Sequence, residues 1–137
     1  MPMERTTIDP NLTRSLEQIE GSALAPAGRT PIGKRCAALR SVPLGALSAG
    51  DLGALIGQRM SLDLVVPRAL DMLAKSPLVA GEDYPGDLLG AVLRIDGSFW
   101  LTHPRWHARV AAIADAVGAG PEEIALELAE FPRQLTA

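Results

Sequence analysis

The sequence is divided into short segments in which apolar residues recur three and four positions apart, with proline or glycine between one segment and the next. This spacing places apolar side chains on one face of an α-helix, which repeats every 3.6 residues. Little of the chain alternates with the two-residue period of a strand, and the nearest candidate strand is the run at 92–95. The sequence predicts an all-α fold: a compact single-domain bundle of five to seven short helices over residues 1–137, with 1–10 as a flexible arm.

Start and stop signals give the expected helix boundaries. Ser48 precedes an apolar run and has Asp51 three residues on, which predicts a helix N-cap. Pro67 leaves two alternatives for its segment, a kinked helix or a helix that starts near the proline. Phe99 and Trp100 are placed in a connection between helices. The expected helices cover residues 12–19, 31–42, 49–60, 62–75, 85–95, 103–117 and 121–131, with a linker at 21–31.

Composition is typical of a folded protein without a metal or disulfide framework. Hydrophobic residues make up 47% of the chain and charged residues 21%, which excludes the disordered and the membrane class. The single cysteine, Cys36, cannot form an internal disulfide and suits a reducing compartment. No apolar leader or stretch of about 20 apolar residues is visible. We therefore expect a cytoplasmic protein that does not bind a membrane and has no cofactor.

Charge is unevenly distributed along the chain. The net charge is −3, which provides no field that would attract nucleic acid. Residues 41–100 nevertheless contain seven acidic and four basic side chains. Three of the acids lie in the turn-rich segment 81–87, which contains no base. We call this segment the acidic loop.

Candidate catalytic residues do not form complete sets. His103 and His107 have the spacing of two zinc ligands, but no Glu lies between them and no third ligand follows, so we interpret them as a capping or surface pair. Cys36 lies at an apolar helical position and is interpreted as buried. Asp83 and Asp87 belong to no acid–base motif. We expect no metal and no catalysis.

Small and aromatic residues are interpreted as packing elements. Gly53 and Gly57, four apart on one helix, predict a close approach by another segment. Trp100 and Trp106 are assigned to the core, because aromatic residues are scarce in this chain, at 4%.

One stretch of the sequence resembles a known family. Its motifs are Leu39-Arg40-Ser41-Val42-Pro43-Leu44, Leu47-Ser48-Ala49-Gly50-Asp51-Leu52, Leu55-Ile56-Gly57-Gln58, Leu64-Val65-Val66-Pro67-Arg68-Ala69-Leu70, Ser76-Pro77-Leu78, Tyr84-Pro85-Gly86-Asp87-Leu88-Leu89 and Phe99-Trp100. In this order and spacing, they are similar to those of immunity proteins of contact-dependent growth inhibition (CDI) systems. The similarity covers residues 39–100.

The resemblance implies a cytoplasmic protein that binds and neutralises the C-terminal toxin domain of a cognate surface protein. Occlusion of the toxin, and not chemistry, would give protection. Toxins of such systems are often nucleases, and a basic nuclease would attract the acidic middle of this chain. We therefore assign the partner-binding surface to the acidic loop and its flank, namely Glu82, Asp83, Tyr84, Asp87 and Asp96.

Two other functions are compatible with the composition. One is a generic helical adaptor or regulatory subunit that binds another protein. The other is a small hydrolase or metal enzyme that uses His103, His107 and nearby acids. Stoichiometric zinc in the purified protein would favour the enzyme.

Overall fold

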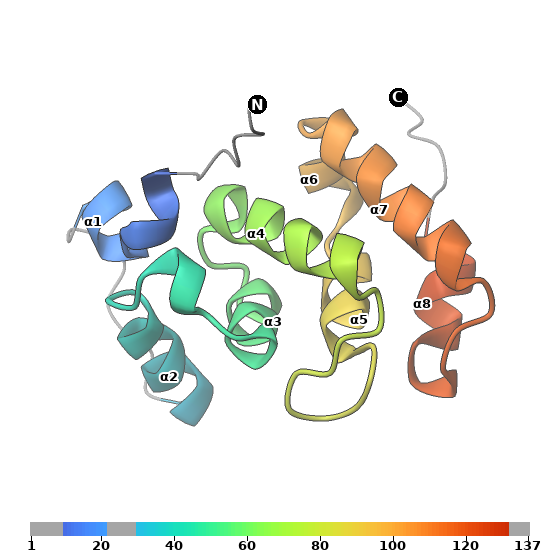
Figure 1. Ribbon diagram of the computed structural model, residues 1–137, viewed down its shortest axis with the longest axis horizontal. Helices are drawn as coiled ribbons and strands as arrows, with labels where there is room; N and C mark the ends of the chain where they lie inside the picture. The colour runs from blue at the N-terminus through green and yellow to red at the C-terminus, as the bar shows by residue number, and fades with distance from the viewer. Residues whose placement is uncertain (1–9, 22–29, 132–137) are drawn as a thin grey trace, which may run out of the picture. The chain divides into compact units, whose positions relative to one another are not determined.

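The structure, a computed structural model, describes residues 10–21 and 30–131. Within these ranges the chain forms eight α-helices, three 3-10 helices and two isolated β-bridges, so the all-α prediction is confirmed (Figure 1). The helices are more numerous than the five to seven expected. The chain forms two compact units, Met1–Leu47 and Ser48–Ala137, and one domain over 1–137 stays a prediction. The expected arm, except Pro10, and most of the expected linker lie outside the described residues.

The first unit contains two short helices and two 3-10 turns. They are η1 (Pro10–Thr13), α1 (Leu16–Glu20), α2 (Pro31–Leu39) and η2 (Leu44–Ala46). The predicted helix at 12–19 is wrong, because Ser15 interrupts it with extended backbone and starts α1 instead. Gln18 N–H donates to the Ser15 hydroxyl (3.1 Å) and Ser15 N–H donates to the Gln18 side chain (2.9 Å), which is a capping box.

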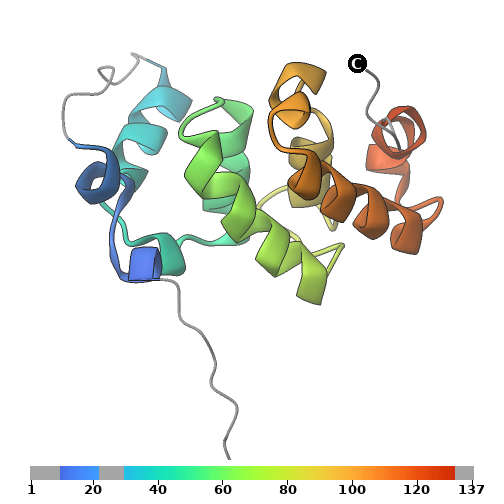
Figure 2. The same cartoon turned by 90° about the horizontal axis from the view of Figure 1, so that it is seen from above.

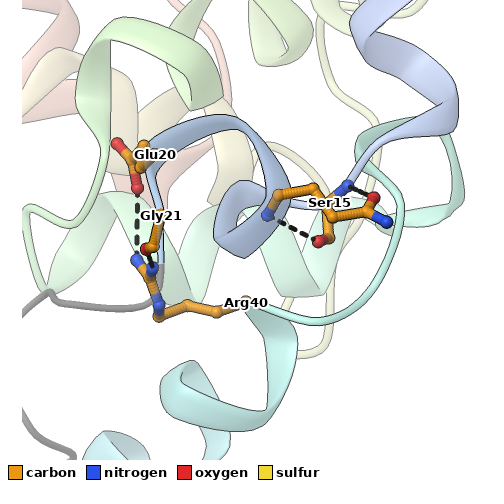
Figure 3. A network of polar contacts seen from close by, with 5 residues as sticks. Ser15, Glu20, Gly21 and Arg40 are labelled. Atoms are coloured by element: carbon orange, nitrogen blue, oxygen red, sulfur yellow. Dashed lines mark hydrogen bonds and ion pairs between the residues drawn. The ribbon is translucent and has the colours of Figure 1, made fainter.

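Arg40 connects the end of α2 to α1. Its guanidinium donates to Glu20 (3.1 Å) and to the carbonyl of Gly21 (3.1 Å), as Figure 3 shows. The carbonyl of Arg40 in turn accepts the N–H of Glu17 at 2.9 Å. These bonds satisfy polar groups at the ends of two helices that are too short to be stable alone. Leu16, Cys36 and Leu44 are the buried apolar residues that accompany them, together with Leu39 and Leu47.

The second unit contains six α-helices. They are α3 (Ala49–Gly57), α4 (Leu62–Lys75), α5 (Asp87–Leu93), α6 (Gly97–Leu101), α7 (Pro104–Val117) and, after η3 (Glu122–Ile124), α8 (Ala125–Glu130). Helices α4 and α7 lie side by side, and α3 and α5 pack on each other and on α4 (Figures 1 and 2). Helix α6 packs on α7, and η3 and α8 pack on α5. The core is aliphatic apart from Trp100, His107 and Phe131.

Several predicted boundaries in this unit are confirmed or corrected. The capping box of Ser48 and Asp51 is present (2.9 and 3.1 Å). Helix α4 starts at Leu62 and continues through Pro67 as one helix, so the alternative of a start near the proline is wrong. The candidate strand at 92–95 is wrong, because its first two residues belong to α5 and the others form a turn.

Pro85 does not lie in the first turn of α5, contrary to the prediction. Gly86 follows it in the left-handed region (φ 93°), which breaks helical continuity, and α5 begins at Asp87. The connection predicted to hold Phe99 and Trp100 is itself helix α6, of five residues. Helix α6 is too short to show a clear apolar period, so the sequence alone gives no signal for it.

The two glycines of the predicted ladder do not mark a close approach. A Cβ added at Gly53 would be in ordinary contact with Leu88 (4.0 Å), and one at Gly57 would meet nothing within 4 Å. The close approaches in this unit occur instead at Gly50, Gly81, Gly90 and Gly120.

Candidate protein-binding surface

The acidic loop connects α4 to α5, and its last residue, Asp87, bonds to its first three. One carboxylate oxygen of Asp87 accepts the backbone N–H of Gly81 at 2.6 Å. The other accepts the N–H groups of Glu82 (3.0 Å) and Asp83 (2.9 Å). The N–H of Asp87 donates to the carbonyl of Tyr84 at 3.1 Å, which closes the turn. Backbone amides in a helix or sheet donate to backbone carbonyls. In this loop, the amides of residues 81–83 donate to the carboxylate of Asp87 instead.

This arrangement favours the charged form of Asp87. Partial burial would raise the pKa of its carboxyl, but the backbone N–H donors from residues 81–84 outweigh that effect and lower the pKa. The carboxylate also lies in the first turn of α5, where the helix dipole favours negative charge. Asp87 thus remains an acceptor at neutral pH, with its oxygens turned toward the loop.

Close backbone contacts fix the loop against α3. A Cβ added at Gly81 would lie 3.1 Å from the Cα of Gly50 and 3.0 Å from both carboxylate oxygens of Asp87. A Cβ at Gly50 would lie 2.7 Å from Cγ and Oε2 of Glu82. Two glycines therefore allow the loop to pack on the first turn of α3, with the side chain of Glu82 lying over Gly50.

Tyr84 belongs to a chain of polar side chains that joins the loop to α8. A hydrogen bond between Arg94 and the side chain of Tyr84 is the largest effect on the pKa of Arg94 and raises it, despite partial burial. Arg94 Nε also donates to Glu127 at 2.9 Å. Tyr84 itself is half-buried.

Asp96 lies apart from the other four predicted binding residues. It precedes α6, so the whole of α5 separates it from Asp87, a length of about 10 Å for seven helical residues. Ser98 donates to its carboxylate at 3.0 Å and Arg59 Nε lies 3.8 Å away. The Ser98 hydrogen bond is the largest cause of a lowered pKa at Asp96. The structure brings Glu82, Asp83, Tyr84 and Asp87 together and leaves Asp96 at the other end of α5.

Most acids of the middle segment have partners within the second unit. Asp63 lies 3.3 Å from His103 Nε2, and Asp71 lies 3.2 Å from Arg109. Asp51 is bonded in the capping box, Asp87 in the loop and Asp96 to Ser98. Glu82 also has an interaction partner within the protein, and both Glu82 and Asp83 are exposed.

A segment distant in sequence packs beside Gly86, near the end of the loop, and carries two further acids. A Cβ at Gly86 would lie 3.4 Å from Pro121 and 3.4 Å from Ile124, so η3 runs beside the loop. Glu122 and Glu123 lie between those two contact residues and are exposed. Sequence reasoning assigned these acids to the start of a helix. No signal in the sequence indicated that Pro121 lies next to Gly86.

The histidines and most aromatic residues form one ring cluster, which lies on α6, on α7 and at the end of α8. Its buried part contains Trp100, His107 and Phe131, and His107 stacks on Phe131 with centroids 5.0 Å apart. In its half-buried part, His103 stacks between Phe99 and Trp106, at 4.3 Å from each. The interpretation of His107 as a capping or surface residue is wrong, because it is 3% exposed. His103 occupies the N-cap position of α7, but its side chain makes no capping bond.

Trp100 is a core residue as predicted, with its indole N–H donating to the carbonyl of Ile95 at 3.1 Å, whereas Trp106 is only half-buried. Cys36 is buried as expected, and burial raises the pKa of its thiol, which opposes nucleophilic use. Among the described residues, no group of three or more His, Cys, Asp or Glu side chains is placed to hold a metal ion. None of the helices in that part of the chain has the length and apolar character to cross a membrane.

The fold and the loop define a class: a small all-α protein in which an internally bonded acidic loop carries exposed carboxylates. Comparison with known families is more specific. The family of CDI immunity proteins matches residues 18–110, a range that includes α3 to α6, the acidic loop and the first half of α7. The chain belongs to this family. No curated protein matches it.

Proposed function

We propose that this protein binds the C-terminal toxin domain of a cognate CDI surface protein and neutralises it by occlusion, without catalysis. The observation that carries the proposal is membership of the CDI immunity proteins over residues 18–110. The toxin is a nuclease with a basic nucleic-acid cleft, and the complex forms in the cytoplasm. The alternative of a generic helical adaptor has no specific observation in its favour.

We propose further that the acidic loop faces the toxin. Glu82 and Asp83 are exposed, and so are Glu122 and Glu123 in the segment that packs beside Gly86. A basic cleft is complementary to such a surface, and complementary charge mainly accelerates association and selects the partner. Tyr84 adds a half-buried aromatic ring of the type enriched at binding hot spots. Asp96, at the other end of α5, contributes at the edge of the surface.

The test uses the toxin domain of the CDI surface protein whose gene the proposed function places immediately upstream of this one. Cells that express this domain should survive when they also express the wild-type protein, and the two purified proteins should form a complex. Absence of both protection and complex formation would overturn the function. If the protein forms a complex with the toxin domain but this domain has no nuclease activity, the immunity function is supported and the nuclease assignment is wrong.

Charge reversal tests the surface separately. The double variant Glu82→Lys, Asp83→Lys should associate about tenfold more slowly at low ionic strength, and less so at high salt, because salt screens exposed charges. The matched control is Asp115→Lys, Glu130→Lys, which has the same change in net charge on α7 and α8. Equal association rates for the two double variants would remove the loop from the interface and leave the immunity function intact.

A further inference from the structure

The bonding pattern of Asp87 separates its role from those of its acidic neighbours. Its two oxygens accept three backbone N–H groups within the loop, at 2.6, 3.0 and 2.9 Å. A carboxylate with this many internal donors has little capacity left for a partner protein. Glu82 and Asp83 differ from it, because their backbone amides are bonded to Asp87 while their side chains are exposed.

Close contacts hold both ends of the loop. Gly81 fits between the carboxylate of Asp87 and the backbone of Gly50, with no room for a Cβ without displacement. At the other end of the loop, Gly86 has a left-handed backbone (φ 93°) and lies against Leu78, Pro121 and Ile124. Both ends of the loop are thus held by packing, and the amides between them are held by a single side chain.

We propose that Asp87 is a positioning residue, which holds residues 81–83 in the conformation that binds the toxin. This inference rests on the proposed function, because it concerns the same loop. A loop that is already ordered loses less conformational freedom on binding than one that must first be ordered. When only a fraction of molecules has the competent conformation, the apparent affinity falls by that fraction. Asp87 therefore acts on affinity through the shape of the loop and not through contact.

The variant that isolates this effect is Asp87→Asn. It preserves size and one oxygen, but it places an NH2 group opposite backbone N–H groups that need an acceptor. We expect hydrogen exchange at the amides of Gly81, Glu82 and Asp83 to accelerate about tenfold or more, as these amides open more often. Affinity for the upstream toxin domain should fall about tenfold if one molecule in ten retains the competent loop.

The matched control is Asp115→Asn, which removes the same charge from the exposed face of α7. It should leave the three loop amides and the affinity unchanged within about twofold, since a distant exposed charge has little effect on binding. Asp87→Glu is a second comparison. It restores the charge but has an extra methylene in a space limited by Gly81, so rescue should be partial.

The outcomes separate this inference from the function on which it rests. If the wild-type protein does not bind the toxin domain, both the function and the positioning role are overturned. If binding is normal and Asp87→Asn exchanges its loop amides faster without loss of affinity, only the positioning role is overturned. If Asp87→Asn does not fold, exchange in the wild-type protein decides: unprotected amides at Gly81, Glu82 and Asp83 would contradict the proposal, and protected amides would support it.

Discussion

Gly90 and Ile124 are in direct contact across the interface of α5 and η3. A Cβ added at Gly90 would lie 2.8 Å from Cγ2 of Ile124, a distance that real Cβ atoms do not show. Both residues are buried, and Ile124 is fully inaccessible to solvent. Because the branched Cγ2 cannot rotate away freely, glycine at position 90 is required by the approach of η3.

Gly90→Ala should therefore destabilise the protein. The added methyl group costs about 1–3 kcal/mol in overlap, and the gain of up to about 1 kcal/mol in helix propensity offsets only part of it. Gly53→Ala is the control, since a Cβ there lies 4.0 Å from Leu88; this variant should be neutral or more stable by up to about 1 kcal/mol. Urea unfolding of both variants measures the difference. Equal changes in the free energy of unfolding for Gly90→Ala and Gly53→Ala would contradict the close packing of α5 on η3.

Asp87 should make the stability of the protein sensitive to acid. Its pKa is lowered in the folded state, so its contribution is fully present above the ordinary Asp value of about 3.9 and is lost as the pH falls through the folded value. Asp87→Asn should thus be less stable than the wild-type protein at about pH 7, and the gap should narrow toward about pH 3. Urea unfolding over this range provides the test, with Asp115→Asn as the control. A gap that is independent of pH would show that protonation of Asp87 is not responsible.

The chain of Tyr84, Arg94 and Glu127 should show modest, salt-sensitive coupling. Arg94 and Glu127 are 49% and 23% exposed, so a double-mutant cycle of Arg94→Ala and Glu127→Ala should give about 0.3–1 kcal/mol at low salt and less at high salt. Tyr84→Phe removes only the hydroxyl that bonds Arg94. Its effect should disappear in the Arg94→Ala background. If the changes in the free energy of unfolding are additive for Arg94 with Glu127 and for Tyr84 with Arg94, this connection between the loop and α8 is excluded.

His107 should be required for stability and dispensable for binding. It is buried and stacked on Phe131, so His107→Ala should cost about 2–4 kcal/mol by leaving a cavity in the ring cluster. His103→Ala removes a half-buried ring and should cost less. Toxin affinity, measured at a temperature where each variant is folded, should be unchanged for both. A folded His107→Ala variant that has lost affinity or protection would contradict a purely structural role.

The fold was predicted best where the sequence contains a strong local signal. Helix α3 was placed to within a few residues because Ser48 and Asp51 form a capping box, whose two hydrogen bonds are local in sequence. Helix α6 was missed because five residues contain little more than one turn of periodicity. Pro85 was misplaced because the left-handed backbone of Gly86 follows it, and glycine alone does not indicate which sign of φ it adopts.

The candidate site depended on contacts that are distant in sequence. The local density of acid in residues 81–87 predicted an acidic loop. The approach of the segment that carries Glu122 and Glu123 was not predictable, since it results from the packing of Pro121 on Gly86, 35 positions apart. His107 shows the same limit, because its burial depends on Phe131, at the end of another helix.

The placement of the aromatic residues gives each unit its own natural probe. Residues 1–47 contain no Phe, Tyr or Trp, whereas the only thiol of the chain, Cys36, lies within them and is buried. Tryptophan fluorescence therefore reports on Ser48–Ala137 alone, and the rate of thiol labelling reports on Met1–Leu47 alone. Without any engineered label, a single titration with denaturant can follow both signals. Coincident transitions would mean that the two units unfold as one cooperative domain, and a thiol that becomes reactive before the fluorescence changes would mean that the first unit opens independently.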